Sequence, residues 1–357
     1  MSTFVLILFS SDLVPFSYQM GAFIKTASSE LILFIVFSSV AKNIDVDDLK
    51  LVVWVALLAG FYGILVYIIK VNPYVHLANM LYVGEDRFEF FLEEARGGLM
   101  GRSSGTLHHP LAWGQLWNLL IAFFLIIKTK INMKPWVKNL FLIIGFCNVY
   151  FSGSRTALIV LAVVFLIAFY LQNGKKIVVY FALALLIFVP VNGVLKENSE
   201  YDKISRYMES VVFFWDQSAY QKADINGSNA DMRADQLTLS VEIAGQNPIG
   251  GLGFNSVQYF GSEKFTGMMG FESIVFKKLV EQGLLGLLCF FFSYYLLFRY
   301  SNRKSLCRSK EKLVQSVVFF CAYMLSLLFT GVQGTWEVFL LLVMFSSKTE
   351  NSLCKNR

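Results

Sequence analysis

Long apolar segments that are nearly free of charge recur along this 357-residue sequence. A helix needs about 20 apolar residues to cross the hydrocarbon core of a bilayer, where its backbone polar groups must be satisfied internally. Strands of a membrane barrel would give alternating segments of about ten residues instead. Only 16% of the residues are charged, well below the ~25% of an average soluble domain. The sequence therefore predicts an all-α, polytopic integral membrane protein.

About ten segments are candidate transmembrane helices on this length criterion. The clear candidates are Leu51–Ile69, Leu111–Ile127, Leu140–Phe151, Ala157–Leu171, Ile177–Leu195, Ile274–Phe298 and Leu313–Phe329. Trp336–Phe345 is short and is expected to complete a hairpin with the span before it. Two N-terminal candidates are weaker, because Phe4–Ile24 contains Asp12 and Pro15, and Ser28–Ala41 is short. We expect a single transmembrane helical domain over residues 1–357.

Lysine and arginine residues indicate the orientation of these spans. They gather in the loops at 128–138, 175–176 and 299–312, and Lys42 and Lys50 flank an earlier loop. Basic loops of multispanning proteins lie in the cytoplasm. Both termini are then cytoplasmic, and residues 71–110, 152–155 and 196–271 lie outside. The net charge of +6 thus follows from membrane topology, and we expect no nucleic-acid partner.

The longest outer segment, residues 196–271, is too long for a simple connection. Two stretches within it, at 205–216 and 232–244, have apolar faces at helical spacing. We therefore expect a long extracytoplasmic loop with short helices inserted in it.

A first polar motif lies in the outer loop at residues 101–110, which read GRSSGTLHHP. Glycine lets the backbone approach a ligand closely, and the guanidinium of Arg102 matches the geometry of a phosphate. His108 and His109 are candidate proton acceptors. The alternative is an interfacial loop in which Arg102 meets lipid headgroups and the histidines cap the next helix.

A second motif, residues 152–156, reads SGSRT and precedes an apolar span. Arg155 would then lie at a helix N-terminus, whose backbone N–H groups favour a bound anion. Arginine on the outer side runs against the usual charge distribution, which favours a functional interpretation. The alternative is an arginine that extends to the headgroup level.

A third motif places Arg233 in the first turn of the helix expected at 232–244. A cation at this end opposes the helix dipole, so Arg233 needs an anionic partner. That partner is either a bound anion or a neighbouring carboxylate, Asp231 or Asp235.

A fourth group comprises residues 247–254 (NPIGGLGF), 271–273 (FES) and 281–286 (EQGLLG). The glycines do not form a nucleotide loop, because no Walker lysine follows and no strand precedes. Glu272 lies where the long loop re-enters the membrane, and its carboxylate is a candidate base. The alternative is a solvated acid at a helix start. The sequence has no metal-ligand spacing, so we expect neither a metal nor a cofactor.

In order and spacing these motifs resemble the O-antigen ligase and O-antigen polymerase superfamily of bacterial envelope glycosyltransferases. The resemblance extends from the Arg102 loop to residues 281–286. It implies a GT-C type, metal-independent enzyme whose donor is a glycan on undecaprenyl diphosphate. By this resemblance Arg155 and Arg233 bind the diphosphate, Arg102 assists, and Glu272, His108 or His109 activates the acceptor.

One departure separates the possible activities. Ligases of this family carry a His-Asn pair where this sequence has Glu272-Ser273. This difference favours a polymerase of lipid-linked repeat units, which builds O-antigen, capsule or exopolysaccharide. The alternatives are a ligase that transfers glycan to lipid A-core or another acceptor, and a non-enzymatic flippase or transporter. The resemblance further implies the bacterial cytoplasmic (inner) membrane, membrane lipid as a partner, and a flippase and a chain-length regulator as associated proteins.

Overall fold

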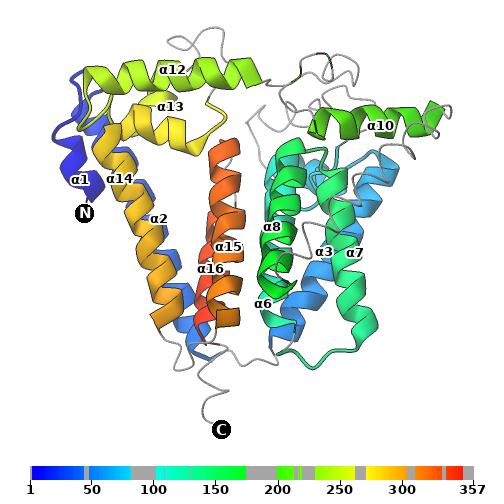
Figure 1. Ribbon diagram of the computed structural model, residues 1–357. Helices are drawn as coiled ribbons and strands as arrows, with labels where there is room; N and C mark the ends of the chain where they lie inside the picture. Colours follow the sequence, from blue (N-terminus) through cyan, green and yellow to red (C-terminus); the bar gives the residue numbers. More distant parts are fainter. Residues whose placement is uncertain are drawn as a thin grey trace. The chain divides into compact units, whose positions relative to one another are not determined.

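The computed structural model describes residues 2–43, 48–81, 102–107, 109–128, 130–173, 199–212, 216, 218, 230–261, 271–303, 310–331 and 335–348. Every regular element within these ranges is a helix, which confirms the predicted all-α class. The chain divides into two compact units that interleave along the sequence (Figure 1). Unit 1 comprises residues 1–44, 230–307 and 327–357, and unit 2 comprises residues 45–229 and 308–326.

Unit 2 is built around one central helix. Its helices are α3 (Leu49–Ile69), α4 (Pro73–Leu81), α6 (Pro110–Ile127), α7 (Pro135–Phe151), α8 (Arg155–Asn173), α10 (Ser199–Val212) and most of α15 (Lys310–Phe329). Helix α6 is apolar on nearly all sides, as expected of a helix that other helices surround. Trp113 and Trp117 are fully buried, and Trp113 donates a hydrogen bond from its indole nitrogen to the Asn148 side chain of α7 (3.1 Å).

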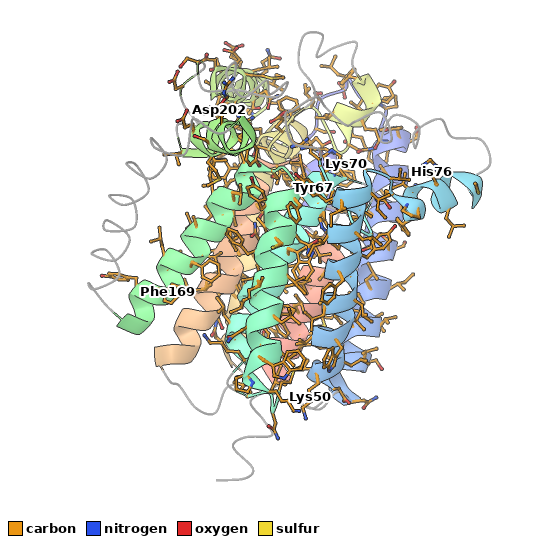
Figure 2. All side chains as sticks on the ribbon, turned by 90° about the vertical axis from the view of Figure 1, so that its right-hand side faces the viewer. Lys50, Tyr67, Lys70, His76, Phe169 and Asp202 are labelled. Atoms are coloured by element: carbon orange, nitrogen blue, oxygen red, sulfur yellow. The ribbon has the colours of Figure 1, made fainter. Side chains whose placement is uncertain are left out.

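The two ends of unit 2 carry different polar residues. Lys50 lies at one end of α3, whereas Lys70 lies at the other end, toward Asp202 of α10 (Figure 2). The predicted orientation, with Lys50 in the cytoplasm and α10 outside, requires this arrangement within unit 2. Helix α10 also begins and ends earlier than the stretch predicted at 205–216.

Unit 1 contains two helices that run side by side, α2 (Phe16–Asn43) and α16 (Trp336–Lys348) (Figure 1). Its other helices are α1 (Ser2–Ile7), α12 (Ala230–Gln246), α13 (Ser256–Phe260) and α14 (Ile274–Arg303). Helix α12, which confirms the stretch predicted at 232–244, packs on α14.

A break in α14 is closed by a loop from elsewhere in unit 1. Gly283 interrupts the helix with φ 63° and ψ −169°, a conformation that only glycine adopts without strain. The carbonyl of Val280 instead accepts a hydrogen bond from Leu252 N (2.9 Å). Leu284 N donates to the carbonyl of Pro248 (2.8 Å). The motifs at 247–253 and 281–286 are therefore one structural element.

Among the described residues, three helices are long and apolar enough to cross a membrane, namely α2, α3 and α6. Shorter apolar helices include α7, the first part of α8, and α16. These helices support an integral membrane protein with helical spans, and the predicted spans at 51–69 and 111–127 coincide with α3 and α6. The span predicted at Ile177–Leu195 lies outside the described residues.

The N-terminal prediction is wrong, because one continuous helix replaces the two spans expected at 4–24 and 28–41. Helix α1 ends at Ile7, a turn containing Asp12 follows, and α2 begins directly after Pro15. The helix continues through residue 26, where the hydroxyl of Thr26 donates to the Ala22 carbonyl of the same helix (2.9 Å).

This correction removes the basis for placing both termini in the cytoplasm. The segment after α1 packs on the 247–253 loop, where Asn247 Nδ2 donates to the Phe9 carbonyl (3.0 Å). The C-terminal halves of α2 and α16 are adjacent, since Ser38 Oγ contacts Met344 Sδ at 3.6 Å. Residue 2 and residue 348 therefore lie toward opposite ends of α2, which is a single candidate span.

We predict that Gly283→Ala destabilises the protein. A Cβ at this position would lie 2.5 Å from the Pro248 carbonyl oxygen, and the backbone strain is roughly 1–3 kcal/mol. Thermal unfolding of the detergent-solubilised full chain should show a lower Tm. Gly245→Ala is the matched control, because a Cβ there meets nothing within 4 Å. Equal Tm values for the two variants would contradict this account of the break.

Candidate functional site

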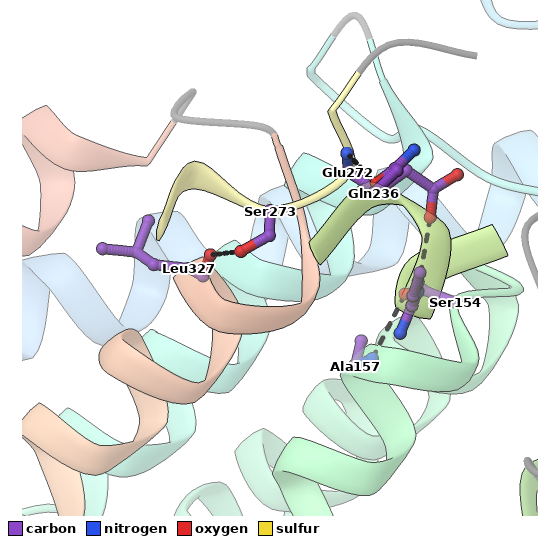
Figure 3. A network of polar contacts seen from close by, with 7 residues as sticks. Ser154, Ala157, Gln236, Glu272, Ser273 and Leu327 are labelled. Atoms are coloured by element: carbon purple, nitrogen blue, oxygen red, sulfur yellow. Dashed lines mark hydrogen bonds and ion pairs between the residues drawn. The ribbon is translucent and has the colours of Figure 1, made fainter. Parts of the chain in front are cut away.

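The turn between α7 and α8 is shaped by three small residues. Gly153 N donates to the Tyr150 carbonyl (3.0 Å), and Gly153 has φ +60°, which is favourable for the residue that ends a helix. Ser154 then caps α8, because its hydroxyl accepts a hydrogen bond from Ala157 N (3.1 Å; Figure 3). Arg155 is thus the first residue of a 19-residue helix. The positive end of this helix favours an anion.

The loop that contains Arg102 is anchored on this same turn. Arg102 Nη2 donates to the Gly153 carbonyl (3.0 Å), and Ser103 N donates to the Phe151 carbonyl (2.8 Å). The hydroxyl of the fully buried Ser103 donates to the Gly63 carbonyl of α3 (2.8 Å). Two arginines that are far apart in the sequence, Arg102 and Arg155, are therefore brought to one turn of unit 2.

A tyrosine that the sequence did not single out lies beside these two arginines. Tyr207 belongs to α10, which packs against α8, and its side chain is only 8% exposed. Its ring makes an edge-to-face contact with Tyr150, with ring centroids 5.9 Å apart. Burial raises the pKa of Tyr207, and the charges of Arg102 and Arg155 oppose that rise. The sequence marked this stretch as a helix, but nothing in it distinguished Tyr207 from other aromatic residues.

His109 acts as the cap of α6. Its Nδ1 accepts a hydrogen bond from Leu111 N (3.1 Å), and Pro110 occupies the first helical position. A neutral imidazole that accepts at Nδ1 carries its proton on Nε2. Protonation at Nδ1 would break the cap, so this geometry favours the structural interpretation of His109. His108 lies outside the described residues.

In unit 1 the structure joins two of the predicted site residues. Arg233 of α12 and Glu272 form an ion pair with 3.4 Å between Nη2 and Oε2. The guanidinium also lies 6.0 Å from the ring centre of Phe329. The anionic partner that Arg233 was expected to need is thus Glu272, which is 39 residues away in the sequence. Both side chains are partly exposed, so the pair itself adds only about 0–1 kcal/mol of stability.

The segment that carries Glu272 is held by its backbone and its neighbour. Glu272 N donates to the side-chain oxygen of the buried Gln236 (3.1 Å). The hydroxyl of Ser273 reaches the Leu327 carbonyl at 3.5 Å, and both contacts are drawn in Figure 3. The Ser273 carbonyl accepts from Lys277 N (3.0 Å) in the first turn of α14. Glu272 is therefore fixed immediately before the helix rather than on a free loop.

The described residues thus contain two candidate groups. Arg102, Arg155 and Tyr207 gather in unit 2, and Arg233 and Glu272 gather in unit 1. Within the described parts of the chain, no three His, Cys, Asp or Glu side chains are grouped to hold a metal ion. The chemistry available from these residues is anion binding by guanidinium groups and proton transfer at a carboxylate.

Residues 140–291 match the family model described as O-Antigen ligase, which confirms the resemblance recognised in the sequence. The matched region extends from α7 into α14. It includes Arg155, Tyr207, Arg233 and Glu272, whereas Arg102 precedes it. No curated protein sequence matches the chain.

We predict that Gly153→Ala weakens anion binding without removing a charge. A Cβ on Gly153 would lie 2.7 Å from Arg102 Cγ, so the arginine must move away from the turn. Calorimetric titration of the purified full chain with inorganic pyrophosphate should show a loss of affinity of about tenfold, equivalent to ~1.4 kcal/mol.

Gly261→Ala is the matched control for this experiment. Gly261 also has a positive φ, +54°, but a Cβ there meets nothing within 4 Å. Unchanged pyrophosphate affinity in Gly153→Ala would show that the position of Arg102 is unimportant for anion binding.

Proposed function

We propose that this chain, whose residues 140–291 match the O-antigen ligase family, polymerises oligosaccharide repeat units carried on undecaprenyl diphosphate. The reaction takes place on the outer face of the cytoplasmic membrane and yields O-antigen, capsular polysaccharide or exopolysaccharide. The observation that carries the proposal is the gathering of Arg102, Arg155 and the N-terminus of α8 at one turn, since all three favour a bound anion.

The proposed reaction is a glycosyl transfer. The bond between the anomeric carbon of the growing glycan and the diphosphate oxygen breaks. A bond forms between that carbon and a hydroxyl oxygen of the next lipid-linked repeat unit. The diphosphate leaves with the bonding electrons, and the hydroxyl proton passes to a base. Arg102 and Arg155 stabilise the negative charge that develops on the departing diphosphate, as preorganised donors do in other transfer reactions.

Arg233 and Glu272 supply the remaining roles in this proposal. Arg233 contributes to binding of the diphosphate, and Glu272 accepts the proton of the acceptor hydroxyl. The ion pair between them orients the carboxylate, and the hydrogen bond from Glu272 N to Gln236 fixes the backbone. His108 is the other candidate base. His109 is less suited, because its Nδ1 already accepts from Leu111 N.

A ligase that transfers glycan to lipid A-core or another acceptor is the alternative, and the description of the matching family favours it. The Glu272-Ser273 pair, in place of His-Asn, favours the polymerase. A flippase or transporter is the second alternative from a different class. Such proteins concentrate ionisable residues near the membrane midplane, whereas the candidate residues here lie at helix ends and in loops.

Reconstitution of the purified chain with lipid-linked repeat units distinguishes these activities. The polymerase produces a ladder of longer glycans on undecaprenyl diphosphate. A single transfer to added lipid A-core would establish the ligase instead. The absence of any glycosyl transfer, with movement of lipid-linked units across the bilayer, would contradict both enzymatic readings.

We predict that Arg155→Ala and Arg233→Ala abolish chain growth in this assay, with a loss of about 100-fold or more. Arg155→Lys should also be impaired, since lysine cannot supply two parallel hydrogen bonds to a phosphate. Arg206→Ala is the matched control, because Arg206 is exposed and pairs with Asp202 one turn earlier on α10. Wild-type ladders from either Arg155→Ala or Arg233→Ala would contradict the diphosphate role of that residue.

We predict that Glu272→Gln retains binding of the lipid-linked donor but lowers turnover by roughly 100-fold, the usual contribution of a general base. Glutamine preserves the shape of the side chain and its contact with Arg233 but cannot take up a proton. Asp202→Asn, at the partly exposed pair on α10, is the control. Wild-type turnover of Glu272→Gln over a range of pH would exclude Glu272 and leave His108 as the candidate base.

A further inference from the structure

The hydroxyl of Tyr207 is buried and has no hydrogen-bond partner among the described residues. Buried polar groups in folded proteins are satisfied almost without exception, so each unsatisfied one needs an explanation. The edge-to-face contact with Tyr150 accounts for the burial of the ring. It does not account for the hydroxyl, which a phenylalanine at this position would lack.

The surroundings of this hydroxyl are rich in hydrogen-bond donors and positive charge. Arg102 and Arg155 act on Tyr207 electrostatically from the turn between α7 and α8. Guanidinium groups donate hydrogen bonds and accept none. The N-terminus of α8 likewise presents N–H groups. A ligand with several negatively charged oxygen atoms can accept hydrogen bonds from this hydroxyl and from guanidinium groups beside it.

Hydrogen bonds also connect Tyr150, whose ring contacts Tyr207, with the turn that holds Arg102. Gly153 N donates to the Tyr150 carbonyl (3.0 Å), and the Gly153 carbonyl accepts from Arg102 Nη2 (3.0 Å). Tyr150, whose ring contacts Tyr207, therefore belongs to the same turn that holds Arg102 and leads into Arg155. All of these residues lie in unit 2.

We propose that the Tyr207 hydroxyl donates a hydrogen bond to a phosphate oxygen of the isoprenoid diphosphate held by Arg102 and Arg155. This inference rests on the proposed function and adds a neutral ligand-binding residue to it. Tyr207 lies on α10, so this outer helix becomes part of the substrate site. A neutral donor completes the coordination of a diphosphate oxygen without adding a further positive charge.

Tyr207→Phe tests this inference, because it removes the hydroxyl and keeps the ring contact with Tyr150. Tyr150→Phe is the matched control, since it removes a neighbouring hydroxyl from the same pair of rings. The probe is farnesyl diphosphate, and its affinity for the purified full chain is measured in nanodiscs. The expected loss for Tyr207→Phe is about tenfold or more, as for a hydrogen bond to a charged group. Tyr150→Phe and thermal unfolding of both variants should be close to wild type.

Two further arms identify the source of the phosphate. Inorganic pyrophosphate should show the same dependence on Tyr207, because the shared chemistry is the diphosphate. Replacement of phosphatidylcholine by phosphatidylglycerol in the nanodiscs should leave the effect unchanged. The inference is wrong if Tyr207→Phe lowers the affinity for farnesyl diphosphate in phosphatidylcholine nanodiscs but not in phosphatidylglycerol nanodiscs. The hydroxyl would then bind a lipid headgroup.

The outcomes separate this inference from the proposed function. If Arg155→Ala no longer binds farnesyl diphosphate and Tyr207→Phe binds it as the wild type does, the inference is wrong and the proposed function is retained. If Arg102→Ala and Arg155→Ala also bind farnesyl diphosphate normally, or if the wild type does not bind it, both the inference and the proposed function are contradicted.

Discussion

The hydrogen bond from the Arg102 guanidinium to the Gly153 carbonyl joins the loop before α6 to the turn that begins α8. Without it, Arg102 would be one more cation near the lipid headgroups. With it, Arg102 lies beside Arg155 and the positive end of a 19-residue helix. An anion bound at this turn reduces the repulsion between the two like charges. The proposed diphosphate is such an anion. The roles proposed for Arg233, Glu272 and Tyr207 all depend on its binding.

The glycine motifs have a structural explanation that does not require a ligand. Residues 247–253 fold onto the break in α14, where Leu252 N and Leu284 N form hydrogen bonds that the interrupted helix lacks internally. Backbone groups left unpaired near a bilayer are costly, so a broken helix needs a partner segment of this kind. The break at Gly283 thereby fixes the start of α14, and the segment of Glu272 and Ser273 lies immediately before it.

The helix class and most helix positions follow from the sequence, because apolar length and helical periodicity are local properties. The prediction of two N-terminal spans was wrong because hydropathy does not show whether one helix continues past Lys25. The pairing of Arg233 with Glu272 could not be predicted, because it joins residues 39 positions apart. The sequence offered Asp231 and Asp235 as nearer partners. Tyr207 was missed because its distinction, a buried hydroxyl with no hydrogen-bond partner among the described residues, depends on packing.

Labelling of introduced cysteines most directly tests the proposal that Arg155 and Arg233 both lie outside the membrane, where each could bind the diphosphate. Single cysteines at positions 155 and 233, in a chain without its five native cysteines, are treated with a membrane-impermeant maleimide on intact cells. A cysteine in place of Lys130 marks the side that the sequence predicts to be cytoplasmic. The account predicts that positions 155 and 233 react from outside and that position 130 reacts only after permeabilisation. Labelling of 155 and 233 from opposite sides would contradict it, because residues in different compartments cannot bind the same diphosphate.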